Sequence, residues 1–467
     1  MGDLLAILSQ ASSSLGAHRA AAATAGQNIA NVNTLGYSRQ TANLEAMTPA
    51  DLIANGYIGR GVGLQSITQA RDLFLERQMP AAIAARGFSS TESDALAAVS
   101  ALDPDASGGI SAALGAFYAA MRGVSQRPSD SGLRQAALSA SQALTRSFNR
   151  TAQSLEDARN GVDAQLAGTV DVVNQATTAM ADLNKQIRIA RANGAEPNDL
   201  LDNRRRLQDK ITELTGALPV PNSYGDISMA LPGGAALVSD DRAATLSVIA
   251  DPNNGGHMAV QLTRTDGSGP VTIPGANIGG TMGGAIQARD GAMASAVAGL
   301  DTLAFDLANT VNGVHSAGFA LDGTTGRNLF TVGLSAPGAA STINLDALIA
   351  GNPSLLAAAS VAGAPGDNRN MLALIATERT ALSTGVDAAS SLQNVVTGFG
   401  GSTQRARSIA DQDAGLHAHL SQMRESASGV SIDEEMINMT KAQRAFEAMS
   451  KVITAADEML GTLMQLK

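Results

Sequence analysis

The chain has 467 residues, of which 44% are hydrophobic and 16% are charged, so it is long enough for a sizeable core, roughly three domains, and too apolar to be intrinsically disordered. A net charge of −10 disfavours nucleic acids and anionic membranes as partners, because both need a basic surface. The lack of cysteine excludes disulfides, thiolate catalysis and Cys-ligated zinc.

The first predicted element is a helix that begins after Asp3, a favourable N-cap residue, and ends before the turn residues 31–36. Apolar or small residues recur along it at alternating spacings of four and three, which is typical of a helix that packs along another helix. This N-terminal seam consists of Leu4, Leu8, Ala11, Leu15, His18, Ala22, Ala25 and Ile29.

No run of the sequence approaches the ~18 apolar residues of a membrane span, so we expect no membrane insertion. Residues 1–10 carry no Lys or Arg ahead of their apolar stretch, unlike a Sec signal peptide. The chain is therefore expected to be either cytoplasmic or exported by a route that reads another signal.

The middle of the chain changes from helical to β patterns and back. Helical periodicity, interrupted by turn residues at Asp103-Pro104 and 127–130, extends over 88–102, 110–124 and 132–215. Within 218–290, apolar residues alternate with others between Gly-rich and Asn-rich turns, which predicts strands. Helical patterns return over 291–315 and 367–428.

The last predicted element is a second long helix. Ser431 and Glu434 form a capping-box pattern at its start, where Asp433 and Glu435 add the negative charge that the helix dipole favours. At 1.5 Å per residue it would be roughly 50 Å long, and the first helix roughly 40 Å. Each needs a partner for its apolar stripe, because isolated helices are marginal in water. The C-terminal seam consists of Met439, Ala442, Phe446, Met449, Ile453, Ala456, Leu460 and Leu463.

These elements predict a mainly α fold with a smaller β part. The long N- and C-terminal helices pair in a coiled-coil-like α-helical layer, next to a helical middle domain and one short β-rich outer domain. The expected regions are a terminal helical assembly region over 1–58 and 415–467, a mainly helical middle domain over 59–215 and 286–414, and the β-rich outer domain over 216–285.

No pattern in the sequence indicates catalysis, a cofactor or a metal. His18 is interpreted as a packed side chain, and His417 and His419 would face different sides of a helix. The glycines between 56 and 63 lack the Lys-Ser or Lys-Thr of a phosphate loop and predict a hairpin. The three arginines at 204–206 are interpreted as a solvated, salt-bridged helix face. We expect no enzyme activity, no cofactor and no metal site.

The segment 30–40, Ala-Asn-Val-Asn-Thr-Leu-Gly-Tyr-Ser-Arg-Gln, resembles the N-terminal signature of the flagellar rod, hook and hook-associated proteins. The preceding residues 27–29, Gln-Asn-Ile, fit as well, whereas Leu35 stands where Pro is common. The acidic residues at 433–435, followed by Gln-Arg-Ala-Phe-Glu-Ala at 443–448, resemble the C-terminal signature. Two internal segments, 197–204 and 305–318, favour the hook-associated members that lie between hook and filament.

The resemblance implies a structural subunit of the extracellular flagellum, exported by the flagellar type III apparatus without a cleaved signal peptide. The terminal helices would form the innermost layer of a tubular homo-oligomer, next to the hook protein and a second junction protein, and a cytoplasmic chaperone would hold the C-terminal region before export. The N-terminal assembly residues expected from it are Leu4, Leu8, Leu15, Ile29, Asn31, Asn33, Thr34, Gly36 and Tyr37. Those expected for assembly or chaperone binding at the other end are Met439, Phe446, Met449, Ile453, Leu460 and Leu463.

Three alternatives stay open at this point. Within the same family, the chain could be hook-associated protein 3 or flagellin. It could be a surface adhesin whose β segment binds a ligand. It could also be a wall-cutting enzyme fused to an axial protein, although residues 218–290 are short and Gly-rich for a hydrolase domain.

Overall fold

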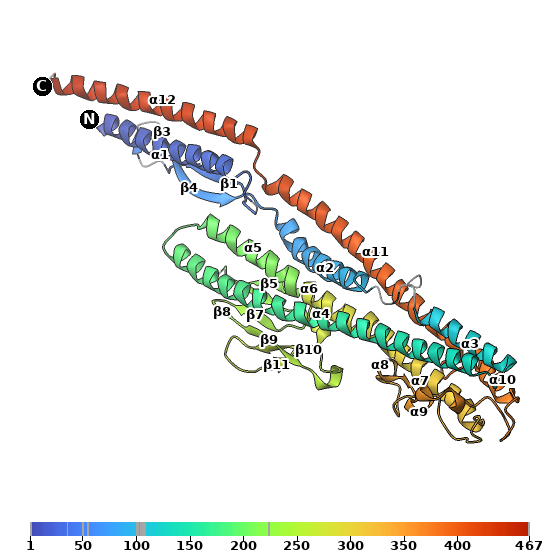
Figure 1. Cartoon of the computed structure of the whole chain (residues 1–467). Helices are drawn as coiled ribbons and strands as arrows, with labels where there is room; N and C mark the ends of the chain where they lie inside the picture. Colours follow the sequence, from blue (N-terminus) through green and yellow to red (C-terminus); the bar gives the residue numbers. More distant parts are fainter. Residues whose placement is uncertain are drawn as a thin grey trace.

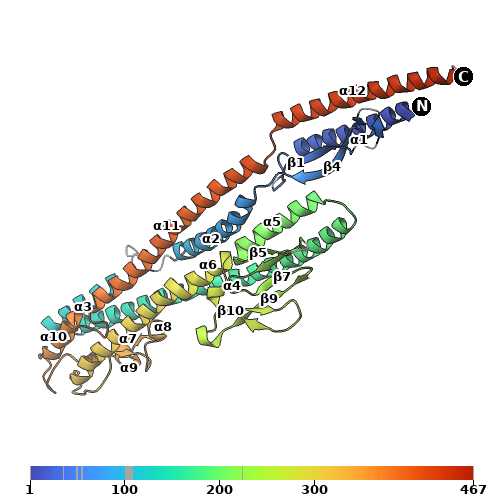
Figure 2. The same cartoon turned by 180° about the vertical axis from the view of Figure 1, so that it is seen from behind.

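The computed structural model describes residues 2–34, 36–48, 51–53, 56–99, 102, 109–222 and 225–465. The predicted break at Asp103-Pro104 and the unusual Leu35 lie outside the described residues. The described chain forms an elongated rod, with the first and last helices side by side at one end (Figures 1 and 2). The predicted mainly α fold with a smaller β part is confirmed.

Long helices form the length of the rod, and most of the short ones lie at its far end (Figure 1). The long helices are α1 (Gly2–Ala30), α2 (Leu73–Ala97), α3 (Ile110–Gln126), α4 (Ser131–Ala192), α5 (Asn198–Thr215), α7 (Ala294–Ala317), α11 (Ala388–Ser428) and α12 (Ile432–Gln465). The short ones are α6 (Gly280–Gln287), α8 (Ala339–Thr342), α9 (Ala347–Gly351) and α10 (Arg369–Ala376). Helices α2, α4, α9 and α11 begin at an Asp cap, as at α4, where the Asp130 carboxylate accepts from two backbone N–H groups.

The strands form small antiparallel sheets. An N-terminal ribbon pairs β1 (Gln40–Ala46) with β4 (Val62–Gln69), and β2 (Asp51–Ile53) with β3 (Gly56–Ile58). A β unit between α5 and α6 contains β5 (Leu218–Pro221), β6 (Ile227–Ala230), β7 (Ala236–Ser239) and β8 (Arg242–Ala243) in one sheet, and β9 (Thr245–Ala250), β10 (Met258–Thr263) and β11 (Val271–Thr272) in another. The short pair β12 (Phe330–Thr331) and β13 (Asn344–Leu345) lies near the far end.

Several predicted boundaries differ from the structure. Helix α1 begins at Gly2, so Asp3 lies inside its first turn and does not precede it. The predicted helix over 132–215 is two helices, because Gly194 and the Pro197 that follows end α4 and begin α5. The pattern over 367–428 is likewise interrupted between α10 and α11.

We call α1, β1–β4 and α12 the terminal module and the helices α2–α11 the helical body. The ribbon crosses the expected boundary at residue 58, because β1 pairs with β4. The expected boundary at residue 414 falls inside α11, which lies along α2 (Figure 1). Two short segments, 70–72 and 429–431, connect the terminal module to the body.

The helical body has a large apolar core at the far half of the rod. Phe117, Met121, Phe148 and Leu155 from α3 and α4 pack there with the leucines of α7. The edge-to-face contact of Phe117 with Tyr118, at 4.9 Å between ring centroids, contributes to the same core. Burial of each such side chain stabilises the fold by roughly 1.5–3 kcal/mol.

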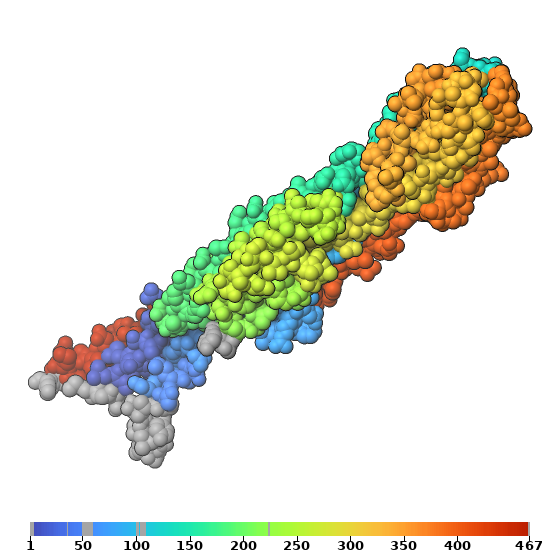
Figure 3. Space-filling view, turned by 90° about the horizontal axis from the view of Figure 1, so that it is seen from below, coloured from blue at the N-terminus to red at the C-terminus, as the bar shows by residue number. Residues whose placement is uncertain are grey.

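The β unit is part of a second core and is not a separate appendage. Its buried residues Met229, Leu237 and Val260 pack with Val173 and Met180 of α4. In Figure 3 the β unit lies flat along the helices in the middle of the rod. The expected division that makes 216–285 a separate β-rich domain stays a prediction. The strands of this region share one interior with the neighbouring helices.

The stretch 280–317 combines α6, a π-helical turn (Ala288–Met293) and α7. By length and composition alone it is the one helix among the described residues that would be apolar enough to cross a membrane. Its leucines, such as Leu300 and Leu307, are buried in the body core, which accounts for the apolar composition. The π-helical turn lets Arg289 reach Asp163 of α4 and the Met258 carbonyl of β10.

Candidate assembly site

The two ends of the chain form one structure, the terminal module. Helices α1 and α12 run antiparallel along each other, with the N and C ends close together (Figures 1 and 2). The β1–β4 ribbon packs on α1, and the Val62 amide donates to the Ser14 hydroxyl at 3.2 Å. Residues more than 400 positions apart in the sequence therefore share one small unit, as the predicted pairing of the terminal helices requires.

The predicted N-terminal seam forms the inner face of α1. None of its eight residues is fully exposed, and Ala11 and Ala25 are buried. The predicted assembly residues Leu4, Leu8, Leu15 and Ile29 are only partly buried. Large side chains on this face are therefore incompletely covered in the single chain.

The C-terminal seam behaves in the same way along α12. The two alanines, Ala442 and Ala456, are buried, and the large residues between and beyond them, down to Leu460, are only partly covered. These partly buried residues are Met439, Phe446, Met449, Ile453 and Leu460. Leu463 differs, because 47% of it is exposed where α12 extends past the start of α1 (Figure 1).

The terminal module also has apolar side chains outside both seams. They belong to α1 and α12 and are between 40% and 76% exposed. This outer apolar face consists of Leu5, Ile7, Met436, Ile437, Val452, Met459 and Met464. Single exposed apolar residues are normal, whereas seven on one helix pair are an unusual amount of exposed apolar surface.

A buried polar junction closes the base of the terminal module. Its centre is Asn28, in the last turns of α1, which is fully buried. The Asn28 side-chain amide donates to the Gln40 carbonyl at 2.8 Å and to Glu435 Oε2 at 3.0 Å. Its Oδ1 accepts from the Gln40 amide and from the Tyr37 hydroxyl, both at 2.9 Å. The Asn28 side chain thus connects α1 to α12 and to the segment 37–40.

Glu435 joins α12 to this loop. It is 3% exposed, and its Oε1 accepts from Arg39 Nε at 2.7 Å. Arg39 Nη1 also pairs with the exposed Glu434 at 3.0 Å. The predicted N-cap at Ser431 is present, since its hydroxyl accepts from the Glu434 amide, but the Glu434 side chain turns to Arg39 and does not complete a capping box.

The other side of the loop meets α5. The Ser38 amide donates to Asp202 Oδ2 at 3.2 Å, and Arg205 connects Ser38 to Glu76 of α2. Gly36 has a φ of +78°, and a Cβ there would lie 2.8 Å from the Arg206 side chain. A side chain at position 36 would therefore be strained both by backbone conformation and by contact.

Burial controls the protonation of this junction. Desolvation, together with Asp199, Asp202 and Glu435, raises the pKa of Tyr37 to about 12, so the phenol stays a donor to Asn28. Burial raises the pKa of Asp202 despite its bond to Ser38 and the nearby Arg71. Burial lowers the pKa of Arg204 to about 10 and also lowers that of Arg205.

The interpretation of 204–206 as a solvated face was wrong for two of the three arginines. Arg204 and Arg205 are buried, and Arg204 donates to the Gly225 carbonyl and to Asn184. The alternation of acidic and basic residues on α5 is the same for a solvated helix and for one that enters a polar junction. Charge pattern alone cannot separate the two cases.

The predicted assembly residues of the loop after α1 divide into two groups. Gly36 and Tyr37 take part in the junction. Asn31, Asn33 and Thr34 form the turn before it, where Thr34 donates to Asn31 Oδ1 and Asn31 donates to the Gln27 carbonyl. The roles of these residues in assembly stay a prediction. Sequence reasoning left out Asn28, Arg39, Asp202 and Glu435, although all four lie in the segments that carried the resemblance.

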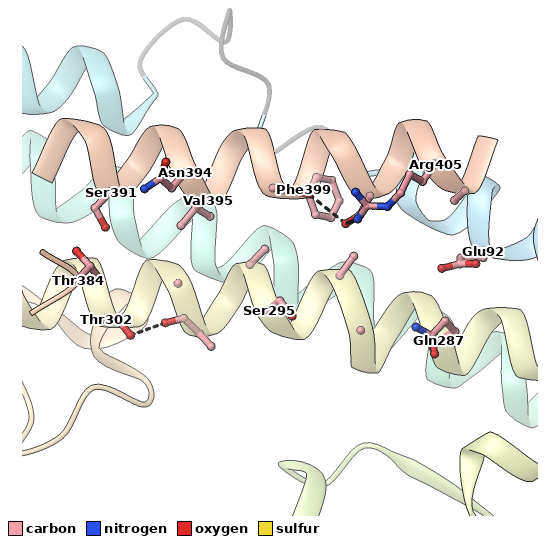
Figure 4. A pocket seen from close by; sticks show the side chains of 18 of the residues that line it. Glu92, Gln287, Ser295, Thr302, Thr384, Ser391, Asn394, Val395, Phe399 and Arg405 are labelled. Carbon is pink, nitrogen blue, oxygen red and sulfur yellow. Dashed lines mark hydrogen bonds between the residues drawn. The ribbon is translucent and has the colours of Figure 1, made fainter. Parts of the chain in front are cut away.

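A hollow lies in the body, between α7 and α11 (Figure 4). This groove has a volume of about 760 Å³ and is lined mainly by small residues, with Phe399 and Arg405 from α11 and Glu92 from α2 at its sides. Within the described residues no group of three or more His, Asp or Glu side chains has the arrangement of a metal site.

The comparisons with known proteins agree with the geometry of the two ends. A family model described as the flagellar hook-associated protein FlgK helical domain matches residues 97–330, just over half of the chain. The chain belongs to the flagellar hook-associated protein FlgK family. A second model, the flagellar basal body rod FlgEFG protein C-terminal region, matches residues 422–466, which include α12.

Individual relatives of the FlgK family are similar over most of the chain. Flagellar hook-associated protein 1 of Bacillus subtilis (strain 168) is 27% identical, over 97% of this chain and 96% of that protein. Flagellar hook-associated protein 1 of Salmonella typhimurium is 28% identical over 70% of this chain, and the match spans 59% of that longer protein. The solved flagellar hook junction protein FlgK from Burkholderia pseudomallei has the same fold, with a TM-score of 0.69 at 18% identity, over 75% of this chain and all of that chain.

Family membership gives the chain its general role. It is a structural subunit of the bacterial flagellum at the junction of hook and filament, and it assembles with other axial components. This agrees with the resemblance seen in segments 30–40 and 197–204 and decides against flagellin and hook-associated protein 3. The family is a structural one, as expected for a chain without a recognisable catalytic motif.

Proposed function

We propose that the terminal module is the element through which copies of this chain assemble into a tube, with the hook protein on one side and the second junction protein on the other. The observation that carries the proposal is the composition of the α1–α12 pair. Its fully buried apolar residues are alanines, whereas its Leu, Ile, Met and Phe residues are partly or largely exposed. A pair built in this way lacks most of the burial that would stabilise it alone.

Neighbouring copies supply the missing cover in this proposal. The outer apolar face of one pair, with Val452 and Met459 at its centre, would pack on the terminal helices of the next copy. Helices with apolar rows on more than one side suit a layer in which each helix touches several others. The predicted assembly residues of both seams would then be fully buried only in the assembled tube.

Charge placed on the outer apolar face tests the proposal. Val452→Glu and Met459→Glu should leave the free subunit folded, because both side chains are exposed, and should abolish polymerisation and motility. Val172→Glu, at a comparably exposed position on α4, is the control and should assemble. Normal assembly of both α12 variants would refute the proposed interface.

We also propose that the chain reaches the cell exterior through the flagellar type III apparatus, without a cleaved signal peptide, and that a cytoplasmic chaperone holds the C-terminal helix beforehand. The same exposed residues of α12 support the second point, because a helix with this much uncovered apolar surface needs a partner before assembly. Secretion of the chain by a strain without the flagellar export apparatus would contradict the first point. Unchanged chaperone capture of Phe446→Ala and Met459→Glu would contradict the second.

A further inference from the structure

The far end of the rod, where α10 lies, contains a buried segment outside the helices and sheets (Figure 1). Residues 356–359 follow the 3₁₀ turn Pro353–Leu355, and all four are buried. Apart from one β-bridge between Ala359 and Phe319, they have irregular backbone. Buried backbone N–H and C=O groups need partners, so this threaded segment has to be held by groups from elsewhere in the fold.

Three buried polar side chains bind the backbone of the threaded segment. Arg134 of α4 donates to the Leu356 carbonyl at 2.7 Å. Asn370 of α10 donates to the Ala357 carbonyl at 2.8 Å. His315, in the last turn of α7, accepts from the Ala357 amide through Nε2 at 3.0 Å. The segment is thus fixed from three helices, and one of the three contacts depends on an imidazole.

The two contacts of His315 determine where its proton lies. Nδ1 is 2.7 Å from the Arg327 carbonyl, which can only accept, so Nδ1 carries the proton. Nε2 faces the Ala357 amide, which can only donate, so Nε2 keeps its lone pair. The bound ring is therefore neutral. A second proton, on Nε2, would replace the hydrogen bond to Ala357 by two N–H groups that point at each other.

The surroundings of the ring act against that second proton. Burial lowers the pKa of His315 from its ordinary value of 6.5, although the Arg327 carbonyl and Asp346 act in the opposite direction. The cations Arg134 of α4 and Arg327 of the loop after α7 add to the effect of burial. Because the pKa is lowered in the closed structure, that structure is fully favoured above pH 6.5 and loses stability as the pH falls from 6.5 toward the lowered value.

We propose that His315 is an acid-sensitive latch: its neutral ring holds the threaded segment in the far end of the rod, and protonation of Nε2 releases the segment. Release removes Leu356 from the core formed with α3, α4 and α7, so the far end opens locally in mild acid while the rest of the body stays folded. The latch lies in the helical body. It goes beyond the proposed assembly through the terminal module and does not depend on it.

Hydrogen exchange of the full-length chain at pH 7 and pH 5 tests the latch. Protection factors, each referred to the intrinsic exchange rate at the same pH, should fall by about threefold or more for amides 356–359. The limit is about 30-fold, for a ring that titrates at 6.5 only after release. Amides 170–180 of α4, which pack in the other core, should keep their protection. No loss at 356–359, or an equal loss throughout the body, would overturn the proposal.

The variant His315→Gln replaces the ring by a group that does not titrate. Its side-chain amide can accept from Ala357 and donate to the Arg327 carbonyl, so amides 356–359 should be equally protected at both pH values. His417→Gln, at a partly buried ring on α11, leaves the latch in place and should show the wild-type loss. An acid loss that persists in His315→Gln would overturn the proposal.

A second variant keeps His315 and covers the case in which the Gln variant folds poorly. Asp346 caps α9 by accepting from the Leu348 and Ile349 amides, and Asn can do the same. Asp346→Asn removes a charge that favours the protonated ring, so the loss of protection should continue to a lower pH before it levels off. A loss that levels off at the wild-type pH or above it would overturn the proposal. These measurements involve no polymerisation, so they and the assembly test can fail independently.

Discussion

The helical body and the terminal module bury different kinds of side chain. In the body, aromatic and long aliphatic residues such as Phe117, Phe148 and Leu155 are completely buried. In the α1–α12 pair the completely covered apolar residues are alanines, and the tightest contacts are the polar ones around Asn28 and Glu435. We therefore expect the body to be stable alone, whereas the terminal module, as proposed above, is completed by neighbours.

The contrast has a physical basis in how burial scales with side-chain size. A buried Phe or Leu contributes roughly 1.5–3 kcal/mol, whereas alanine has little surface to bury. The hydrogen bonds of the polar junction require specific geometry, so they fix how the parts of the terminal module are oriented. Each hydrogen bond contributes only about 1 kcal/mol net to stability. Variants in the two regions should therefore differ in whether they change folding or assembly.

The largest expected effect comes from removing the β unit. Replacement of 220–272 by a Gly/Ser linker uncovers α4 residues, and the cost has an upper limit of about 6–12 kcal/mol for four large side chains. The side chains concerned are Leu166, Val170, Val173 and Met180. The shared core predicts loss of cooperative unfolding in a urea titration of this variant. Replacement of only the exposed turn at 265–268 is the control, and equal stability of the two variants would refute the shared core.

The next effect concerns a single residue of the body core. Phe148→Ala should lower the free energy of unfolding by about 3–5 kcal/mol, because the ring is fully buried between α3 and its neighbours. Urea denaturation followed by circular dichroism measures it. Val172→Ala, on the exposed side of the same helix, should change the value by less than about 0.5 kcal/mol. A loss below about 1 kcal/mol for Phe148→Ala would mean that the body is loosely packed.

A smaller effect should appear as a pH dependence at the junction. The pKa of Asp202 is raised in the folded chain because burial disfavours the carboxylate, so the folded state binds a proton more tightly than the unfolded state. This contribution to stability is present below the ordinary value of 3.8 and is lost as the pH rises through the raised pKa. Relative to Asp202→Asn, the wild type should become more stable as the pH falls through that window. An opposite slope would show that Arg71 and Arg205 outweigh the desolvation.

The seams and the junction show what the sequence could and could not predict. The period of four and three in α1 and α12 depends on local spacing, so the paired helices could be predicted from residues such as Leu15 and Ile453. The junction depends on residues 164 and 407 positions apart, and a single sequence contains no signal for such contacts. The β1–β4 ribbon was predicted only in part, as a hairpin around 56–63, because its pairing is also non-local.

The smallest effect on folding, and the sharpest test of the contrast, is expected for Phe446→Ala. Phe446 is the only aromatic residue of α12 and is partly buried on its inner face. Because the ring belongs to the terminal module and none of the body core clusters includes it, the main unfolding transition should shift by less than about 0.5 kcal/mol. Polymerisation, chaperone capture or both should nevertheless weaken, so that filament subunits leak into the medium. Glu447→Ala, the exposed neighbour on another face of the helix, is the control and should behave as the wild type. Normal swimming of Phe446→Ala cells would show that α12 assembles through another face. A main transition lowered by several kcal/mol would show instead that the terminal module and the body fold as one unit, and the contrast between them would fail.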